Sequence, residues 1–315
     1  MPAWRKAVTV TALACLAVGS PSSASAQADD PWIPPDLPEL TEAFDGTRAA
    51  LEERIARHDG TVGLVLYDPE TGEGVSIRGD ERFPSASVIK VPVLYEAMLR
   101  VEEGRLALDD PLVMLDDDRA AGAGVLQHLT APYEVNVRDA AFLMTALSDN
   151  AATNLLIEKL GARRVTDRMA ELGLPETRLF RQSFGEPADS FDPEGSERWG
   201  FGVTTPMEQA KLLAWIHRGE AVSPEATDEM LRMLEEQLYQ YGLPRHLPPD
   251  VEVAHKTGSI AEARHDCGIV FAEAREYVLC VMTRENRDTG YAFDNEAEVL
   301  LGDLSRIVYE EVGEP

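Results

Sequence analysis

A serine and a lysine three positions apart, Ser87 and Lys90, are the pair of residues best suited to do chemistry in this chain. Both lie in an apolar segment predicted to be helical over residues 87–103, so their side chains would share one face of the helix. A helix N-terminus favours developing negative charge. A lysine buried among apolar side chains beside another cation loses its charge and can accept a proton. The pair is therefore either a lysine-activated serine or a helix-capping serine near a surface lysine.

Two further motifs follow along the chain. Ser148–Asn150 (Ser-Asp-Asn) lies between two predicted helices, a place where these three residue types are also the ordinary N-caps. Lys256–Gly258 (Lys-Thr-Gly) is predicted to end a strand, where the cation and the hydroxyl would be able to hold a substrate carboxylate. The glycine allows a ligand to approach the backbone closely. Taken singly, each motif also has a purely structural interpretation, as a helix cap or as a strand exit.

In this order, S-x-x-K, S-D-N and K-T-G are the motif set of serine β-lactamases and penicillin-binding proteins. Over about residues 45–312 the chain resembles the class A β-lactamase-like serine hydrolases of that superfamily. The likeness extends to four short segments, residues 122–127, 138–141, 153–156 and 264–266. It implies hydrolysis of β-lactams through an acyl-enzyme, an activity of antibiotic resistance and β-lactam catabolism. It also implies a small-molecule substrate, either a β-lactam or a D-alanyl peptide-like compound, and no cofactor.

The resemblance also implies a role for each motif residue. Ser87 would be the nucleophile, Lys90 its base or proton relay, and Ser148 the group that passes the proton to the leaving nitrogen. The backbone N–H groups of Ser87 and Ser259 would form the oxyanion hole. The residues implied in substrate binding are Asn150, Lys256, Thr257, Ser259 and Arg264, with His265 as a less favoured alternative to Arg264.

One part of the family pattern is missing. Class A β-lactamases deacylate with a glutamate two residues after an R-L-x-R segment, which here spans residues 178–181, and that position holds Ser183. Glu186 is our candidate for the general base, and the alternative is a solvated loop acid. Glu194 and Glu197 are further candidates for the same role.

Deacylation therefore decides between three functions. The leading one is β-lactam hydrolysis through a Ser87 acyl-enzyme. The second is hydrolysis of a D-alanyl peptide or an ester by the same fold without an efficient deacylating glutamate. The third is a β-lactam-binding trap or sensor, which acylates and stops.

The elements that position these motifs are strands near both ends of the chain and helices between them. Hydrophobic patterning predicts strands at residues 61–68, 75–78, 251–254, 267–271 and 277–283. It predicts helices at residues 40–58, 87–103, 138–148, 151–160, 162–172, 206–218, 224–240 and 295–312, with no strand between residues 87 and 245.

This order of elements predicts an α/β (α+β) fold of the β-lactamase/transpeptidase-like type. Its antiparallel sheet is built from both termini, with flanking helices and an inserted all-helical region. The expected divisions are a signal peptide (1–26), a proline-rich lead-in (27–40), a discontinuous sheet domain (41–86 and 246–315) and a helical domain (87–245).

The N-terminus is typical of an export signal. Two basic residues, Arg5 and Lys6, precede an apolar run over residues 7–18 that is short for a bilayer span, and small residues follow. This pattern predicts a cleaved signal peptide and a secreted or periplasmic mature chain without a membrane span. Lipid attachment at Cys15 is the less favoured alternative.

Composition limits the partners. The 315 residues carry 29 Lys+Arg against 56 Asp+Glu, a net charge of −27, which argues against binding to nucleic acid or to an anionic membrane surface. The six histidines lack metal-binding spacing, so no metal is expected. We expect a monomer. Cys267 and Cys280 would face one another on a predicted hairpin, either as a cross-strand disulfide or as two buried thiols.

Overall fold

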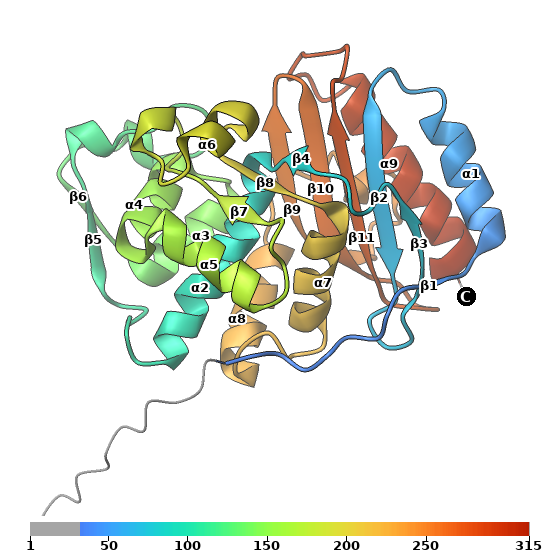
Figure 1. Cartoon of the computed structure of the whole chain (residues 1–315), viewed down its shortest axis with the longest axis horizontal. Coiled ribbons are helices and arrows are strands. Elements are labelled where there is room, and N and C mark those ends of the chain that lie inside the picture. The colour runs from blue at the N-terminus through green and yellow to red at the C-terminus, as the bar shows by residue number, and fades with distance from the viewer. Residues whose placement is uncertain (1–31, 315) are drawn as a thin grey trace, which may run out of the picture. The chain divides into compact units, whose positions relative to one another are not determined.

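A six-stranded sheet, assembled from both ends of the chain, supports the rest of the fold (Figure 1). The structure is a computed structural model that describes residues 32–314, so the expected signal peptide, Cys15 and the start of the lead-in lie outside the described residues. The sheet order is β1-β3-β2-β11-β10-β9. The strands are β1 (Thr41–Glu42), β2 (Thr61–Tyr67), β3 (Glu73–Ile77), β9 (Glu252–Ile260), β10 (Ala263–Phe271) and β11 (Tyr277–Arg284).

All neighbouring strands of this sheet are antiparallel except β1 and β3, which pair in parallel. The prediction of a largely antiparallel sheet built from both termini is therefore confirmed. The central pairing of β2 with β11 joins the N-terminal strands to the C-terminal ones. Residues far apart in the sequence thus meet in one sheet.

Both faces of the sheet are covered by helices. One face carries α1 (Asp45–Ile55) and α9 (Glu296–Val308), and the other carries α7 (Pro206–His217). Side chains of β2 alternate between the faces, as strand geometry requires. Leu64 and Leu66 belong to the hydrophobic cluster under α9, whereas Val65 and Tyr67 belong to the cluster that includes α7. This two-sided burial explains the almost unbroken apolar sequence of β2.

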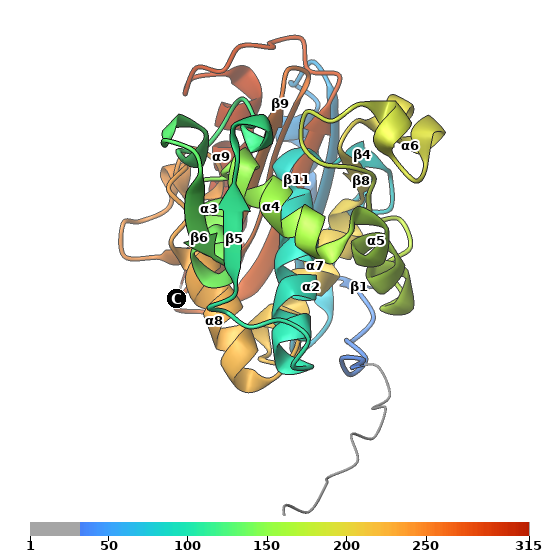
Figure 2. The ribbon, with the colours of Figure 1, turned by 90° about the vertical axis from the view of Figure 1, so that its left-hand side faces the viewer.

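The remaining helices form a region beside the sheet, which lies in front of it in Figure 2. They are α2 (Lys90–Glu102), α3 (Val137–Ala146), α4 (Asn150–Leu160), α5 (Ala162–Glu171), α6 (Pro193–Trp199) and α8 (Pro224–Glu235). A buried ion pair between Glu96 of α2 and Arg168 of α5, 3.2 Å apart, joins two of them. The further division of the chain into two domains remains a prediction.

The prediction that no strand lies between residues 87 and 245 is wrong. The helical region also contains short strands, and one more lies just before it: β4 (Phe83–Pro84), β5 (Pro111–Met114), β6 (Tyr133–Asn136), β7 (Arg178–Leu179) and β8 (Gly202–Thr204). They have two to four residues each, too few for an alternating pattern to stand out in the sequence. β4, β8 and β7 form a three-stranded sheet, and β4 leads directly into the segment of Ser87.

The two cysteines pair across neighbouring strands. Cys267 of β10 lies opposite Cys280 of β11, and the two form a disulfide. The disulfide alternative is thus correct and the two free thiols are not. Among the described residues, no helix combines the length and the apolar character needed to cross a membrane.

The close packing of β9 against β10 gives a stability prediction. Gly268 lies opposite His255, and a Cβ atom added at Gly268 would be 2.5 Å from the His255 Cβ and 2.9 Å from a backbone oxygen. Gly268→Ala should lower the free energy of unfolding by about 1–3 kcal/mol, because the strands must separate to relieve the clash.

The matched control is Gly46→Ala in α1, where an added Cβ atom meets nothing within 4 Å. This variant should be neutral or more stable by up to about 1 kcal/mol, because alanine favours a helix. Urea denaturation measures both variants. A Gly268→Ala variant as stable as the wild type would contradict the packing described.

Candidate active site

Ser87 lies in a tight turn that opens into a cavity of about 510 Å³. The turn is a 3-10 helix, Ala86–Ile89, between β4 and α2, and Ala86 has a left-handed backbone with φ of 43°. β9 packs directly against this turn, because a Cβ atom added at Gly258 would be only 3.1 Å from the Ser87 backbone nitrogen. Glycine in the Lys-Thr-Gly motif therefore lets the strand approach the serine.

Six of the nine predicted site residues line this cavity. They are Ser87, Ser148, Asn150, Thr257, Ser259 and Arg264. The two lysines of the motifs are buried and do not line it, and Glu186 is outside it. Three motifs that are far apart in the sequence thus meet around one space.

Lys90 is buried at the start of α2 and connects it to the turn between α3 and α4. Its Nζ atom lies 2.7 Å from the Ser148 carbonyl oxygen, 3.1 Å from the Ser148 Oγ and 2.9 Å from the Asn150 Oδ1. Burial lowers the pKa of Lys90 well below its ordinary value, and the positive charge of Lys256 lowers it further, while Asp149 opposes the shift. A lysine with such a pKa is a competent proton acceptor.

The Ser-Asp-Asn motif combines the structural role and the chemical one. Asp149 is the N-cap of α4 and accepts a hydrogen bond from the Ala152 backbone N–H. Its second carboxylate oxygen accepts from the backbone N–H groups of Val125 and Leu126. Its neighbours on both sides line the cavity. Asp149 thus holds the turn in place while the flanking residues face the substrate space.

The Lys-Thr-Gly motif lies inside β9, so the prediction that it ends a strand is wrong. The strand continues to Ile260 because it pairs with β10 through Ala263. Lys256 is fully buried and its Nζ donates to the Thr257 carbonyl oxygen at 3.0 Å. Burial lowers the pKa of Lys256 to about 7, although Asp266 opposes the shift. Its charge therefore changes near neutral pH.

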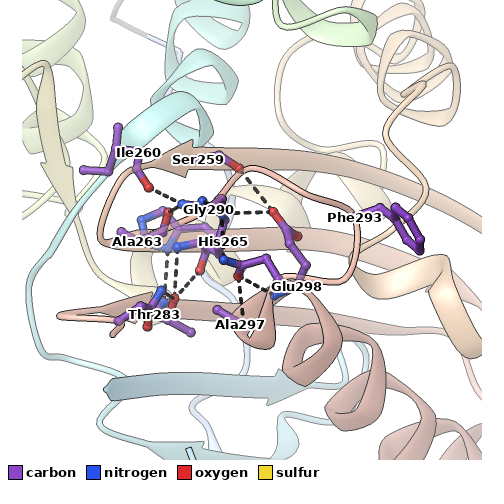
Figure 3. Close-up of polar contacts among 12 residues, drawn as sticks. Ser259, Ile260, Ala263, His265, Thr283, Gly290, Phe293, Ala297 and Glu298 are labelled. Carbon is purple, nitrogen blue, oxygen red and sulfur yellow. Dashed lines mark hydrogen bonds and ion pairs between the residues drawn. The ribbon is translucent and has the colours of Figure 1, made fainter. Parts of the chain in front are cut away.

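Arg264 lines the cavity and His265 does not. The buried His265 ring donates from Nε2 to the Pro84 carbonyl oxygen at 2.7 Å. Its Nδ1 accepts from the Thr283 backbone N–H at 3.1 Å (Figure 3). Burial lowers the pKa of His265 to about 4, so the ring is neutral at pH 7. His265 therefore anchors the segment just before Ser87 rather than contacting substrate.

The structure does not bring Glu186 to the cavity. Its side chain is exposed, and so are those of Glu194 and Glu197 on α6. Ser183 is the loop residue that the Asn154 side chain holds in place. The Asn154 Oδ1 accepts from the Ser183 backbone N–H at 2.8 Å, and the Asn154 Nδ2 donates to the Ser183 carbonyl oxygen at 3.1 Å. Glu186, Glu194 and Glu197 therefore do not line the cavity with Ser87.

Four polar residues that line the cavity were missed from the sequence: Tyr239, Tyr241, Tyr291 and Glu298. No motif contains them. Tyr239 falls at the end of the predicted helix 224–240, although α8 ends at Glu235, and Tyr241 and Tyr291 lie between predicted elements. Glu298 lies in the first turn of α9, where an acidic residue is ordinary. Within the part of the chain that the structure describes, no cluster of three or more His, Cys, Asp or Glu could hold a metal ion.

Comparisons with known proteins agree with this geometry. A family model described as the beta-lactamase enzyme family matches residues 46–312. A β-lactamase of Rhodobacter capsulatus is 30% identical over 275 residues, which cover 87% of this chain and 89% of that protein.

Among solved structures, a β-lactamase from Sphaerobacter thermophilus is similar with a TM-score of 0.75 and 32% identity, over 86% of this chain and 98% of that one. The acyl-enzyme complex of the L158E mutant of PBP-A with penicillin G has a TM-score of 0.75 and 29% identity. It covers 87% of this chain and 98% of that one.

The buried environment of Lys90 predicts that acylation slows when this lysine is replaced by arginine. Lys90→Arg should lower the rate of acylation by a cephalosporin by about 10²- to 10⁴-fold, because arginine retains its proton and does not act as a base. The rate is measured as the growth of the covalent adduct by intact mass spectrometry. Lys211→Arg, at an exposed lysine of α7, is the control and should acylate normally. A Lys90→Arg variant that acylates at the wild-type rate would remove Lys90 from this role.

Proposed function

The chain belongs to the beta-lactamase enzyme family, and on that premise we infer that it hydrolyses β-lactams through an acyl-enzyme formed on Ser87. The observation that carries this inference is the buried Lys90, with its lowered pKa, bonded to Ser148 beside the cavity that Ser87 lines. A serine, a lysine with a lowered pKa and a second serine, grouped beside one cavity, are the groups needed to open an amide-like ring.

Acylation follows from the arrangement of these groups. The Ser87 Oγ attacks the lactam carbonyl carbon while Lys90 accepts the hydroxyl proton. The backbone N–H groups of Ser87 and Ser259 stabilise the oxyanion. As the carbon–nitrogen bond breaks, the leaving nitrogen takes a proton from Ser148, which regains one from Lys90. The products are an ester on Ser87 and a free amine in the opened ring, with the lysine neutral again.

Substrate binding is assigned to the other motif residues. The Asn150 Oδ1 accepts from Lys90 and its Nδ2 donates to the Ala121 carbonyl oxygen, which orients the amide and leaves one N–H for the substrate. Thr257 and Ser259 also line the cavity, and we assign their hydroxyl groups to binding of the substrate carboxylate. Lys256 lies buried next to Thr257, where its charged form attracts that carboxylate.

Among the described residues, no carboxylate of the loop that holds Ser183 lines the cavity, so this loop supplies no general base for deacylation there. The anchored loop position holds Ser183, and its neighbour Phe184 lines the cavity in place of an acid. This supports deacylation as the slow step. It also favours a second candidate function, a trap or sensor in which the acyl-enzyme persists.

We also propose that the protein is exported from the cytoplasm. The basic residues and the short apolar run at the N-terminus support a secreted or periplasmic enzyme.

Turnover of a chromogenic cephalosporin tests the function. The purified protein should release many product molecules per enzyme and show a covalent adduct by intact mass. Ser87→Ala should abolish both results, because no nucleophile remains. Ser76→Ala, which removes a hydroxyl on β3, is the control and should retain both. Hydrolysis that survives in Ser87→Ala would overturn the assignment of the nucleophile.

The position of Ser183 in its loop predicts that a glutamate at this position speeds deacylation. Ser183→Glu places a carboxylate at the position that Asn154 anchors, and it should raise the steady-state rate by at least about tenfold while lowering the acylated fraction. Glu186→Gln is the matched control and should leave both quantities unchanged, because Glu186 is exposed outside the cavity. Loss of deacylation in Glu186→Gln would show that Glu186 reaches the acyl carbon after all.

A further inference from the structure

A buried carboxylate occupies the part of the cavity assigned to the substrate's own carboxylate. Asn295 caps α9 by accepting from the backbone N–H groups of Ala297 and Glu298, which fixes Glu298 in the first turn. The Glu298 side chain is 6% exposed, and its Oε1 lies 3.4 Å from the Ser259 Oγ (Figure 3). The same oxygen lies 3.4 Å from the Arg264 Nε. Among the described residues that line the cavity, Glu298 is the one carboxylate.

The donors of Arg264 are already engaged within the protein. Its Nη1 donates to the carbonyl oxygens of Ile260 and Ala263, and its Nη2 donates to that of Gly290. Its guanidinium carbon lies 4.7 Å from the centre of the Tyr291 ring. The charge of Arg264 is therefore balanced by Glu298, and its side chain is held by the surrounding backbone. Arg264 therefore lines the cavity, but its two terminal nitrogens are already engaged and do not offer a bidentate site to an incoming anion.

We propose that Glu298 is a specificity-determining residue, which competes with the substrate carboxylate for the Ser259 hydroxyl and for the positive charge of Arg264, and which must be protonated for an anionic substrate to bind well. This inference rests on the proposed function, because it concerns the carboxylate of the same substrate. Ionised Glu298 repels that carboxylate and occupies the Ser259 hydroxyl. Neutral Glu298 removes the repulsion and can donate a hydrogen bond to the substrate.

The surroundings of Glu298 place this change near neutral pH. Burial raises the pKa of Glu298 to about 7, the negative charge of Asp266 on β10 adds to the rise, and Arg264 opposes it. Arg245, in the 3-10 turn Leu243–His246, also opposes the rise, and the phenol of Tyr241 faces the same group.

Lys256 on β9 also titrates near pH 7, and its charged form favours an anion. Both groups therefore weaken binding of an anionic substrate as the pH rises. Variants of Glu298 are needed to separate the two contributions.

The test compares a cephalosporin that carries a free ring carboxylate with its methyl ester, using the full chain at pH 6 and pH 8. For the wild type, KM of the acid should rise by about tenfold between these pH values, the change expected one unit above the pKa of a group that must be protonated. KM of the ester should stay nearly constant. Glu298→Gln mimics the protonated acid, so its KM for the acid at pH 8 should fall about fivefold or more with kcat unchanged.

Glu296→Gln, at an exposed glutamate in the same turn of α9, is the matched control and should behave as the wild type. Glu298→Ala provides a second variant, and it should also lower KM for the acid relative to the ester.

Two results would overturn the inference alone. One is a higher KM for the acid in Glu298→Gln, which would mean that Glu298 orients Arg264 for binding. The other is an equal change for acid and ester. A wild-type chain that turns over neither compound would instead overturn the proposed function, and this inference with it.

Discussion

The arrangement of the site depends on one interaction, the burial of the Lys90 amine between α2 and the turn before α4. A charged ammonium is costly to bury, so burial lowers the pKa of Lys90, and the charge of Lys256 lowers it further. The amine donates hydrogen bonds to three oxygen atoms of Ser148 and Asn150. These bonds position the two residues at the edge of the cavity. The same bonds join α2, which follows Ser87, to the turn before α4. Reactivity and local structure thus have one physical cause.

The sheet supplies the other wall of the site. β9 reaches the turn of Ser87 because Gly258 has no side chain, and His265 of β10 anchors the preceding segment through Pro84. Two buried groups with pKa values of about 7 and opposite charge then act at the carboxylate end of the cavity: Glu298, which lines it, and Lys256, which lies behind Thr257. In the proposed mechanism, Lys90 controls the rate of acylation, the loop of Ser183 controls the rate of deacylation, and the carboxylate end of the cavity selects the charge of the substrate.

The residues that act within a short motif could be predicted from the sequence, since spacing along a helix or strand fixes their relative positions. Ser87, Ser148 and Thr257 line one cavity as the motifs imply. The loop could not be predicted, because Asn154 anchors Ser183 through the backbone, and no sequence pattern records that contact. Glu298 is also invisible in the sequence, because its importance comes from α9 packing on β10. The largely antiparallel sheet was predictable from apolar runs, whereas strands of two to four residues were not.

The most direct test of the account is the protonation state of Lys90 in the resting protein. The chain has only five lysines, so labelling their side-chain carbons gives few NMR signals, and Lys90→Arg identifies the signal of Lys90. The account predicts that this signal titrates well below the ordinary lysine pKa of 10.5, because burial and Lys256 both disfavour the charge. A Lys90 signal that titrates near 10.5 in the folded protein would contradict the account, because the lysine would then be charged when Ser87 has to lose its proton.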